Sequence, residues 1–378
     1  MPYITVMQTQ RNHQVTLEDI IFDRVPFYRN TLPSATNGTV TFYTQRTDTL
    51  AKHMRSVHIP SLVSALEMFN QANEALFEAE RSSLYHTFYI PKKSGGYRRI
   101  DEPNAELMAA LRQLKAIFEE RFNALYHTSA YAYVRGRCTV DAIKKHQRNR
   151  SKWFLKTDFS NFFGSTNEDF TWRMITQIFP FSEVVKTKRG EDALRKALNL
   201  GFLDGGLPQG TPLSPLLTNI IMIPFDHRVA NELVKRGFVY TRYADDIQIS
   251  HRENFNFKEV CDYIDGVLKD FDAPFAIKPT KTRYGSSSGR NWNLGVMLNG
   301  DNKITVGRKN KEYLKAACNN YITDRKRGVK WDPHDVCVLL GKMEYINMVE
   351  PDYIRGFLSW FNEKHNVNLK KLLREELR

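Results

Sequence analysis

The chain has 378 residues, of which 42% are hydrophobic, enough for one extended core or for two to three smaller subdomains. Its 55 Lys and Arg against 42 Asp and Glu give a formal charge of +13, which favours polyanionic partners. Cys138, Cys261, Cys318 and Cys337 lack CxxC or Cys/His spacing, which argues against a structural zinc site and fits a reduced, cytoplasmic compartment. There is no long apolar run and no signal-peptide pattern, so we expect a soluble protein without a membrane partner.

The first 81 residues contain no motif that we can place. Within them, a turn-rich stretch precedes a short predicted strand at 39–44, and apolar residues at helical spacing predict an amphipathic helix at 56–81. A second long helix is predicted at 105–126. Helical apolar spacing recurs near the C-terminus, at 311–326, 335–348 and 351–365.

A basic hairpin is predicted between the first two long helices. The Ser-Gly-Gly turn at 94–96 is flanked by Lys92, Lys93, Arg98 and Arg99, as expected of a β-hairpin with a flexible tip and basic arms. Such a hairpin could fold over a triphosphate. From composition alone, a solvated basic turn is an equally good interpretation.

Three carboxylates stand at the ends of predicted strands. The apolar strand 153–158 ends in Asp158, and two runs of β-formers at 238–250 flank the sequence Tyr-Ala-Asp-Asp, which contains Asp245 and Asp246. Adjacent carboxylates repel each other and are costly to desolvate, so at the bend of an apolar hairpin they indicate neutralisation by cations. An isolated Asp-Asp pair is more often a polar turn. With Asp158, however, the set suits two-metal phosphoryl transfer with Mg²⁺.

A loop rich in Gly and Pro lies between these strands. Residues 205–219 read GGLPQGTPLSPLLTN, in which glycines allow backbone to approach a ligand closely. Ser214 and Pro215 open the apolar run that follows, which predicts the N-terminus of a helix. Taken alone, this segment would be a structural loop.

In this order, the segments resemble the reverse transcriptases, specifically the bacterial branch that includes retron enzymes, group II intron maturases and phage-defence reverse transcriptases. The sequence TDFSNFF is similar to the family's motif A, LPQGTPLSPLLTN to motif B and YADD to motif C. Residues 278–282 resemble motif D and 293–296 the primer-grip motif E, while 90–100 resemble the fingers hairpin and 133–137 the stretch that follows it. The similarity extends from about residue 82 to about residue 307.

The resemblance implies an α+β right-hand polymerase fold with fingers, a palm of antiparallel sheet plus helices, and a helical thumb. We expect an N-terminal extension at 1–81, fingers at 82–150, the palm at 151–302 with a fingers insertion at about 170–200, and the thumb at 303–378. The extension is either an RNA-gripping element or packing against the fingers. The thumb segment holds 16 Lys and Arg against 10 Asp and Glu, and basic helices beside a groove would contact phosphates.

The resemblance also implies roles for individual residues. The implied catalytic residues are Asp158, Asp245 and Asp246. These three and Phe159 are implied to bind two Mg²⁺ ions, for which Mn²⁺ could substitute. The residues implied to bind the nucleotide are Lys92, Arg98, Phe163, Gln209 and Lys281. Those implied to bind nucleic acid are Arg135, Arg137, Tyr243, Leu294 and Gly295.

Three of these roles are specific enough to test. Phe163 would stand under the sugar of the incoming nucleotide and clash with a 2′-hydroxyl, and its alternative role is core packing. Gln209 and Gly210 would contact the template-side nucleotide. Lys281 would act as a proton donor near the pyrophosphate, although a surface lysine is nearly as good an interpretation.

The predicted function is RNA-directed DNA synthesis from dNTPs, with a structured noncoding RNA as template, a DNA product and a defence effector as partner in an anti-phage system. Retron enzymes typically carry NAxxH before motif A and VTG after motif E. This chain has DAIKKH at 141–146 and ITVG at 304–307, two near misses. The alternatives are a group II intron-type or general reverse transcriptase, non-templated synthesis, or a non-catalytic RNA-binding scaffold. An RNA-dependent RNA polymerase is disfavoured by Phe163 and Tyr243, and the diversity-generating branch by Gln209.

Overall fold

The computed structural model describes residues 4–6, 13–15, 58–92, 95–122, 126–287 and 295–377. The strand predicted at 39–44 and Leu294 lie outside the described residues. The chain forms two compact units. The first contains the chain up to Arg137, Leu155–Ile249 and Phe255–Tyr284, and the second contains Cys138–Phe154, Ser250–Asn254 and Gly285–Arg378.

The first unit begins with β1 (Ile4–Val6) and β2 (His13–Val15), which pair antiparallel. The helix predicted at 56–81 is present but divided into α3 (Ile59–Ala72), α4 (Glu74–Glu78) and a 3₁₀ turn at Arg81–Leu84. The division falls at Asn73, whose side chain donates a hydrogen bond back to the carbonyl of Phe69 and so ends α3.

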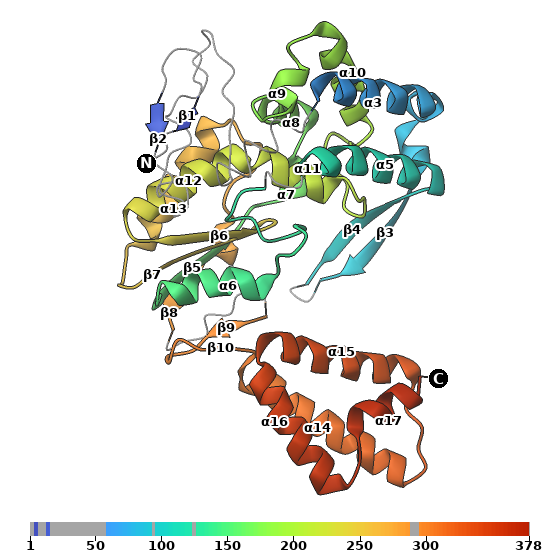
Figure 1. The fold of residues 1–378 in the computed structure, drawn as a ribbon, viewed down its shortest axis with the longest axis vertical. Coiled ribbons are helices and arrows are strands. Elements are labelled where there is room, and N and C mark those ends of the chain that lie inside the picture. The colour runs from blue at the N-terminus through green and yellow to red at the C-terminus, as the bar shows by residue number, and fades with distance from the viewer. Residues whose placement is uncertain are drawn as a thin grey trace. The chain divides into compact units, whose positions relative to one another are not determined.

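The predicted basic hairpin is confirmed. Strand β3 (Tyr85–Pro91) pairs antiparallel with β4 (Tyr97–Pro103), and the tip contains Gly95 and Gly96, both with positive φ. Helix α5 (Ala105–Phe122) follows β4, and residues 123–125 of the predicted helix lie outside the described residues. Figure 1 shows the hairpin as the long blue-green ribbon whose strands lead to α5.

A four-stranded sheet has the order β6-β7-β5-β8. Its strands are β5 (Trp153–Asp158), β6 (Val239–Tyr243), β7 (Asp246–His251) and β8 (Arg283–Ser286). The predicted strand at 153–158 and the predicted hairpin at 238–250 are therefore both confirmed. The remaining helices of the first unit are α7 (Phe162–Ser165), α8 (Glu168–Ile175), α9 (Phe181–Val184), α10 (Lys188–Asn199), α11 (Ser214–Ile221), α12 (Ile223–Lys235) and α13 (Phe257–Asp270), with a 3₁₀ turn at Pro279–Lys281.

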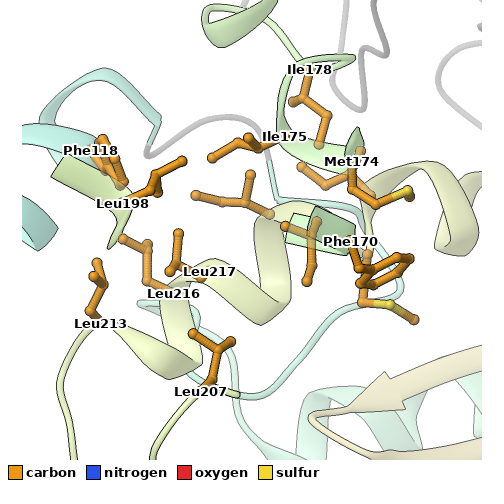
Figure 2. Close-up of a cluster of buried hydrophobic side chains, with 14 of the residues drawn as sticks. Phe118, Phe170, Met174, Ile175, Ile178, Leu198, Leu207, Leu213, Leu216 and Leu217 are labelled. Atoms are coloured by element: carbon orange, nitrogen blue, oxygen red, sulfur yellow. The ribbon is translucent and has the colours of Figure 1, made fainter. Parts of the chain in front are cut away.

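The core of the first unit joins the helices on both sides of the Gly- and Pro-rich loop. Helix α11 begins at Ser214 as predicted, and seven of its eight residues are buried. Figure 2 shows Leu216 and Leu217 of α11 beside Leu213, with Phe170 and Met174 of α8 in the same cluster. These side chains are all at most 3% exposed, so the loop that precedes α11 is attached to a rigid base.

The second unit has its own apolar core. Its elements are α6 (Thr139–Arg148), the antiparallel pair β9 (Met297–Leu298) and β10 (Ile304–Thr305), and α14 (Gly307–Lys326), α15 (Pro333–Val349), α16 (Pro351–His365) and α17 (Leu369–Glu375). The three predicted C-terminal helices are confirmed. Helix α15 begins two residues earlier than predicted because Asp332 caps its N-terminus and Pro333 occupies the first turn. Val140 and Ile143 of α6 share the core with Leu314 and Phe361.

Candidate active site

The two adjacent aspartates occupy a tight turn. Strands β6 and β7 are joined by Ala244 and Asp245 alone, so that Asp246 begins β7. Ala244 has φ = +57°, in the left-handed region that residues with a Cβ rarely adopt. Backbone strain of this kind persists only where the surrounding structure fixes it, and it concentrates at functional sites.

Asp158 is brought to this turn by the backbone. The amide of Phe159 donates to the carbonyl of Asp245 at 3.2 Å, so the end of β5 is hydrogen-bonded to the turn. On the other side of β5, the carbonyl of Asp158 accepts from the amide of Lys278 at 2.8 Å. Asp158 therefore ends a strand that is held at both edges, and its side chain is only 8% exposed.

The three carboxylates interact electrostatically. Burial, followed by the charges of Asp158 and Asp246, raises the pKa of Asp245 from its ordinary 3.8 to about 6. Asp158 accepts from Lys281 Nζ at 2.6 Å, and Asp246 lies 3.2 Å from Lys156 Nζ. Burial acts to lower the pKa of Lys281, but its hydrogen bond to Asp158 and the three aspartate charges outweigh this effect and raise it. The turn is thus a concentration of negative charge that attracts cations.

A divalent cation fits this donor set by its chemistry. Carboxylate oxygens are the ligands that hard cations such as Mg²⁺ take, and mutual repulsion among the carboxylates would be relieved by such an ion. Among the described residues, however, no three Asp, Glu, His or Cys side chains already meet in a metal-binding arrangement. Lys281 and Lys156 are paired with two of the three carboxylates, so metal binding requires these lysines to release Asp158 and Asp246.

Phe163 is fixed by the Gly- and Pro-rich loop. Its carbonyl accepts from the amide of Leu207 at 3.0 Å, and its half-buried ring packs edge-on against Phe162. A Cβ at Gly206 would lie 2.1 Å from the carbonyl oxygen of Gly164, so only glycine permits this approach. The loop and the turn after Asp158 are therefore locked together through their backbones.

The same loop is attached to the basic hairpin. The carbonyl of Gln209 accepts from the amide of Asp101 at 2.7 Å, and a Cβ at Gly210 would lie 2.7 Å from the carbonyl oxygen of Asp101. Arg99 adds side-chain ion pairs with Asp101 and Asp204. This is the attachment that holds the base of the hairpin beside Gln209.

Lys92 and Arg98 are exposed on the arms of the hairpin. Asp245, Tyr243 and Arg98 all lie close enough to Tyr133 to interact electrostatically with its hydroxyl. Tyr133 is 57% exposed and has φ = +57°. Tyr133, which was assigned no role from the sequence, is therefore a neighbour of the candidate active site in a strained conformation.

The predicted nucleic-acid contacts fall into three groups. Arg135 is exposed and Tyr243 half-buried at the end of β6, so both are accessible. Arg137 Nη1 donates to the carbonyls of His127 and Ala130 at 2.5 and 2.7 Å, so its guanidinium is already hydrogen-bonded to the backbone of the chain itself. Gly295, in the second unit, is exposed with φ = +85°.

Lys156 is a residue that sequence reasoning missed. It lies two positions before Asp158 in β5, so both side chains project from the same face of the strand, and it pairs with Asp246 of the neighbouring strand β7. The alternation of side chains along 153–158 indicates that Lys156 and Asp158 share a face, but it does not indicate which carboxylate Lys156 would pair with.

A sheet that presents carboxylates at a strand end and at the adjoining hairpin turn, beside a glycine-rich loop and a basic hairpin, defines a nucleic acid polymerase of the right-hand class. The reverse transcriptase (RNA-dependent DNA polymerase) family matches residues 90–314. The chain belongs to this family, and it is an RNA-directed DNA polymerase.

Similar proteins include several retron reverse transcriptases. The chain is 26% identical to the retron Ec83 reverse transcriptase of Escherichia coli over 79% of its own length and 93% of that protein. It is 28% identical to the retron Mx162 reverse transcriptase of Myxococcus xanthus, over 76% of its own length and 62% of that longer protein. A structure of Candida albicans telomerase is similar at a TM-score of 0.42 and 12% identity, covering 78% of this chain and 60% of that one, too little to argue from.

Among the described residues, no helix combines the length and the apolar character needed to span a membrane.

Proposed function

We propose that this reverse transcriptase extends a primer with dNTPs on an RNA template by Mg²⁺-dependent phosphoryl transfer, with Asp158, Asp245 and Asp246 as the catalytic carboxylates. The observation that carries the proposal is the backbone hydrogen bond that joins the end of β5, directly after Asp158, to the turn of Asp245 and Asp246, where burial and the neighbouring charges raise the pKa of Asp245 to about 6. The carbonyl oxygen of Phe159, next to Asp158, is the group through which that residue would contribute to the metal site. Mn²⁺ is expected to substitute for Mg²⁺.

The chain's own residues supply the remaining steps. When bound at the carboxylates, Mg²⁺ would help to deprotonate the primer 3′-hydroxyl and would neutralise charge on the phosphorus oxygens. Lys92 and Arg98 would bind the triphosphate from the exposed hairpin. Phe163 would support the sugar and exclude a 2′-hydroxyl, and Gln209 would orient the nucleotide from the loop. Lys281, which the aspartates keep protonated, would donate a proton to the leaving pyrophosphate.

The fingers, palm and thumb are proposed to follow the division predicted from the sequence. Arg135, Arg137 and Tyr243 are proposed nucleic-acid contacts of the first unit, and Leu294 and Gly295 of the second. Arg137 would act there through the segment that it holds, because its guanidinium donates to backbone carbonyls.

Replacement of Asp245 and Asp246 together by Ala tests the proposal. We expect loss of Mn²⁺ binding, measured by titration with Mn²⁺, and loss of primer extension. The fold should be retained, because repelling charges are removed from a partly buried turn. The matched control is Glu191→Ala with Asp192→Ala, two neighbouring acids of α10 that pair with Lys188 away from the turn. A variant of the turn that extends a primer at the normal rate contradicts the assignment.

We further propose that the template is a dedicated structured noncoding RNA, that the protein acts in the bacterial cytoplasm, and that it serves anti-phage defence with an effector protein. The support is the similarity to retron reverse transcriptases along most of the chain and the charge of +13. Sequencing of the nucleic acid that copurifies with the protein tests the proposal. One discrete RNA species joined to or paired with DNA is expected, whereas a random mixture would favour a general copying enzyme.

A further inference from the structure

A buried ion pair lies behind the turn that carries Asp245 and Asp246. Tyr240 and Arg242 are two positions apart in β6, so their side chains project from the same face of the strand, toward Asp226 in the first turn of α12. The side chains of Arg242 and Asp226 are both completely buried, with no exposed surface. Arg242 Nε and Nη2 donate to the two oxygens of Asp226 at 2.8 and 2.7 Å, and the Tyr240 hydroxyl donates to Asp226 Oδ1 at 2.6 Å.

The third arm of this guanidinium reaches the turn itself. Arg242 Nη1 donates to the carbonyl oxygen of Ala244 at 3.0 Å. Ala244 is the residue with φ = +57°, and its carbonyl belongs to the peptide bond that leads into Asp245. The strained peptide is therefore held by a rigid, planar side chain that is itself held by Asp226.

The backbone of Arg242 connects the same point to a further segment. Its amide donates to the carbonyl of Ser129 at 2.7 Å, and its carbonyl accepts from the amide of Tyr131 at 2.9 Å. Asn219 of α11 then donates to the carbonyl of Ala132 at 2.7 Å, directly before the exposed Tyr133. One residue thus fixes the turn through its side chain and the approach to Tyr133 through its backbone.

Stability alone is a poor explanation for this arrangement. Desolvating two charges costs about as much as their attraction returns, and apolar replacements of a buried ion pair are often neutral or stabilising. Burial acts to lower the pKa of Arg242, but Asp226 outweighs it and raises the pKa, so the guanidinium stays charged. What an apolar pair could not supply is a donor aimed at the Ala244 carbonyl.

We propose that Arg242 is a positioning residue for catalysis, with Asp226 as its anchor: it holds the left-handed turn so that Asp245 and Asp246 face Asp158. This inference rests on the proposed roles of the three aspartates and adds the group that sets their geometry. Displacement of reacting groups by about 1 Å can cost roughly a hundredfold in rate, so loss of the donor should appear in kcat.

The test replaces both charges at once. In Arg242→Met with Asp226→Leu, no uncompensated charge is left in the core, and only the Tyr240 hydroxyl loses its acceptor, so the variant is expected to fold with a melting temperature moderately below that of the parent. Primer extension at saturating dNTP should have a kcat reduced by about 10- to 100-fold. The KM for dNTP should change less than threefold, and the Mg²⁺ concentration for half-maximal activity should rise. A folded double variant with the parent kcat overturns the proposal.

A second variant keeps the proposal testable if the double variant does not fold. Arg242→Lys retains the charge opposite Asp226 but replaces the planar fork by a single ammonium, so a reduced kcat is again expected and a parent-like kcat overturns the proposal. Tyr240→Phe is the matched control, because it removes one hydrogen bond from the same carboxylate and leaves the hydrogen bond from Arg242 to the Ala244 carbonyl in place. It should lower the melting temperature slightly and leave kcat unchanged.

The Asp245→Ala, Asp246→Ala variant is measured in the same assay. If it still extends the primer, the proposed function fails whatever Arg242 does. If it is inactive while the Arg242 and Asp226 double variant keeps the parent kcat, only the positioning role fails.

Discussion

Two of the three carboxylates at the active turn are paired with a lysine. Asp158 pairs with Lys281 and Asp246 with Lys156, whereas Asp245 forms no ion pair within the described part of the chain, and burial and the charges of the other two aspartates raise its pKa. A cation would therefore gain most at Asp245 and would compete with lysines at the other two. This competition gives Lys281 and Lys156 a role in setting metal affinity, in addition to the proton transfer proposed for Lys281.

Phe163 can be tested as the residue that excludes ribonucleotides. Phe163→Ala should admit ribonucleotides several-fold more readily, because the ring that would meet a 2′-hydroxyl is gone. The measurement is the ratio of kcat/KM for a dNTP to that for the matching ribonucleotide. Phe162→Leu is the control: Phe162 is 2% exposed in the core, so its replacement should cost stability and leave the ratio unchanged. An unchanged ratio in the Phe163 variant would mean that Phe163 only packs.

His146 should make the second unit sensitive to acid. It is fully buried with Nδ1 2.6 Å from the Ser250 hydroxyl, and burial, followed by the charge of Lys145, lowers its pKa from 6.5 to about 3. Between these values the unfolded chain binds a proton that the folded chain does not, so stability falls as the pH drops below 6.5. This group should cost about 2 kcal/mol between pH 6.5 and pH 5.

Denaturant unfolding at several pH values checks the effect. His146→Gln removes the titrating group and should show a shallower loss of stability between pH 6.5 and pH 5 than the parent. Parallel curves for the two proteins would show that His146 does not remain neutral when folded.

At the scale of elements, backbone contacts join the glycine-rich loop to its neighbours more tightly than side chains do. Gly206→Ala should break the hydrogen bond between Leu207 and Phe163, because the new Cβ would lie 2.1 Å from the Gly164 carbonyl. We expect a loss of about 1–3 kcal/mol of stability and at least a tenfold lower primer-extension rate. Gly205→Ala is the control, since a Cβ there meets nothing within 4 Å and costs only the strain of φ = +77°. Equal effects of the two variants would contradict this account.

The elements themselves were largely predictable from local sequence. Strand β5, the β6–β7 hairpin, the basic hairpin and the start of α11 all follow from alternation, turn residues and Pro near a helix start, and the structure confirms them. The predicted positions of helix ends were less accurate. The break at Asn73 depends on a side-chain bond back to Phe69, and the early start of α15 on capping by Asp332.

Pairings between distant residues were not predictable. Lys156 and Asp246 are 90 positions apart, and nothing local in either segment names the other. Asp226 belongs to none of the motifs in the sequence, and Arg242 is only one polar residue within the predicted hairpin at 238–250. Only their complete burial in the folded chain reveals that they form a pair. The three aspartates were identified because each is marked by its own strand and by a family motif.

At the scale of the whole molecule, the charge of +13 predicts strong salt dependence for RNA binding. Every RNA shares this counterion-release contribution, so it cannot distinguish a cognate RNA from another of equal length. Recognition of a structured RNA adds contacts to shape and 2′-hydroxyls. The cognate transcript should therefore keep more of its affinity than a scrambled one between 50 and 200 mM salt, as measured by equilibrium binding. Equal affinities and equal salt slopes would remove the case for a dedicated RNA.

The second unit is assembled from three separate stretches of the chain, and this has a consequence for biosynthesis. Helix α6 supplies Val140 and Ile143 to a core whose other members include Leu314 and Phe361. At ordinary elongation rates, roughly 10 to 30 s separate the emergence of α6 from that of Leu314 on the ribosome. During this interval Val140 and Ile143 lack the core partners that α14 and the following helices supply. A nascent chain stalled before α14 should therefore bind chaperones through α6, and a fragment that begins after residue 303 should lack part of its own core.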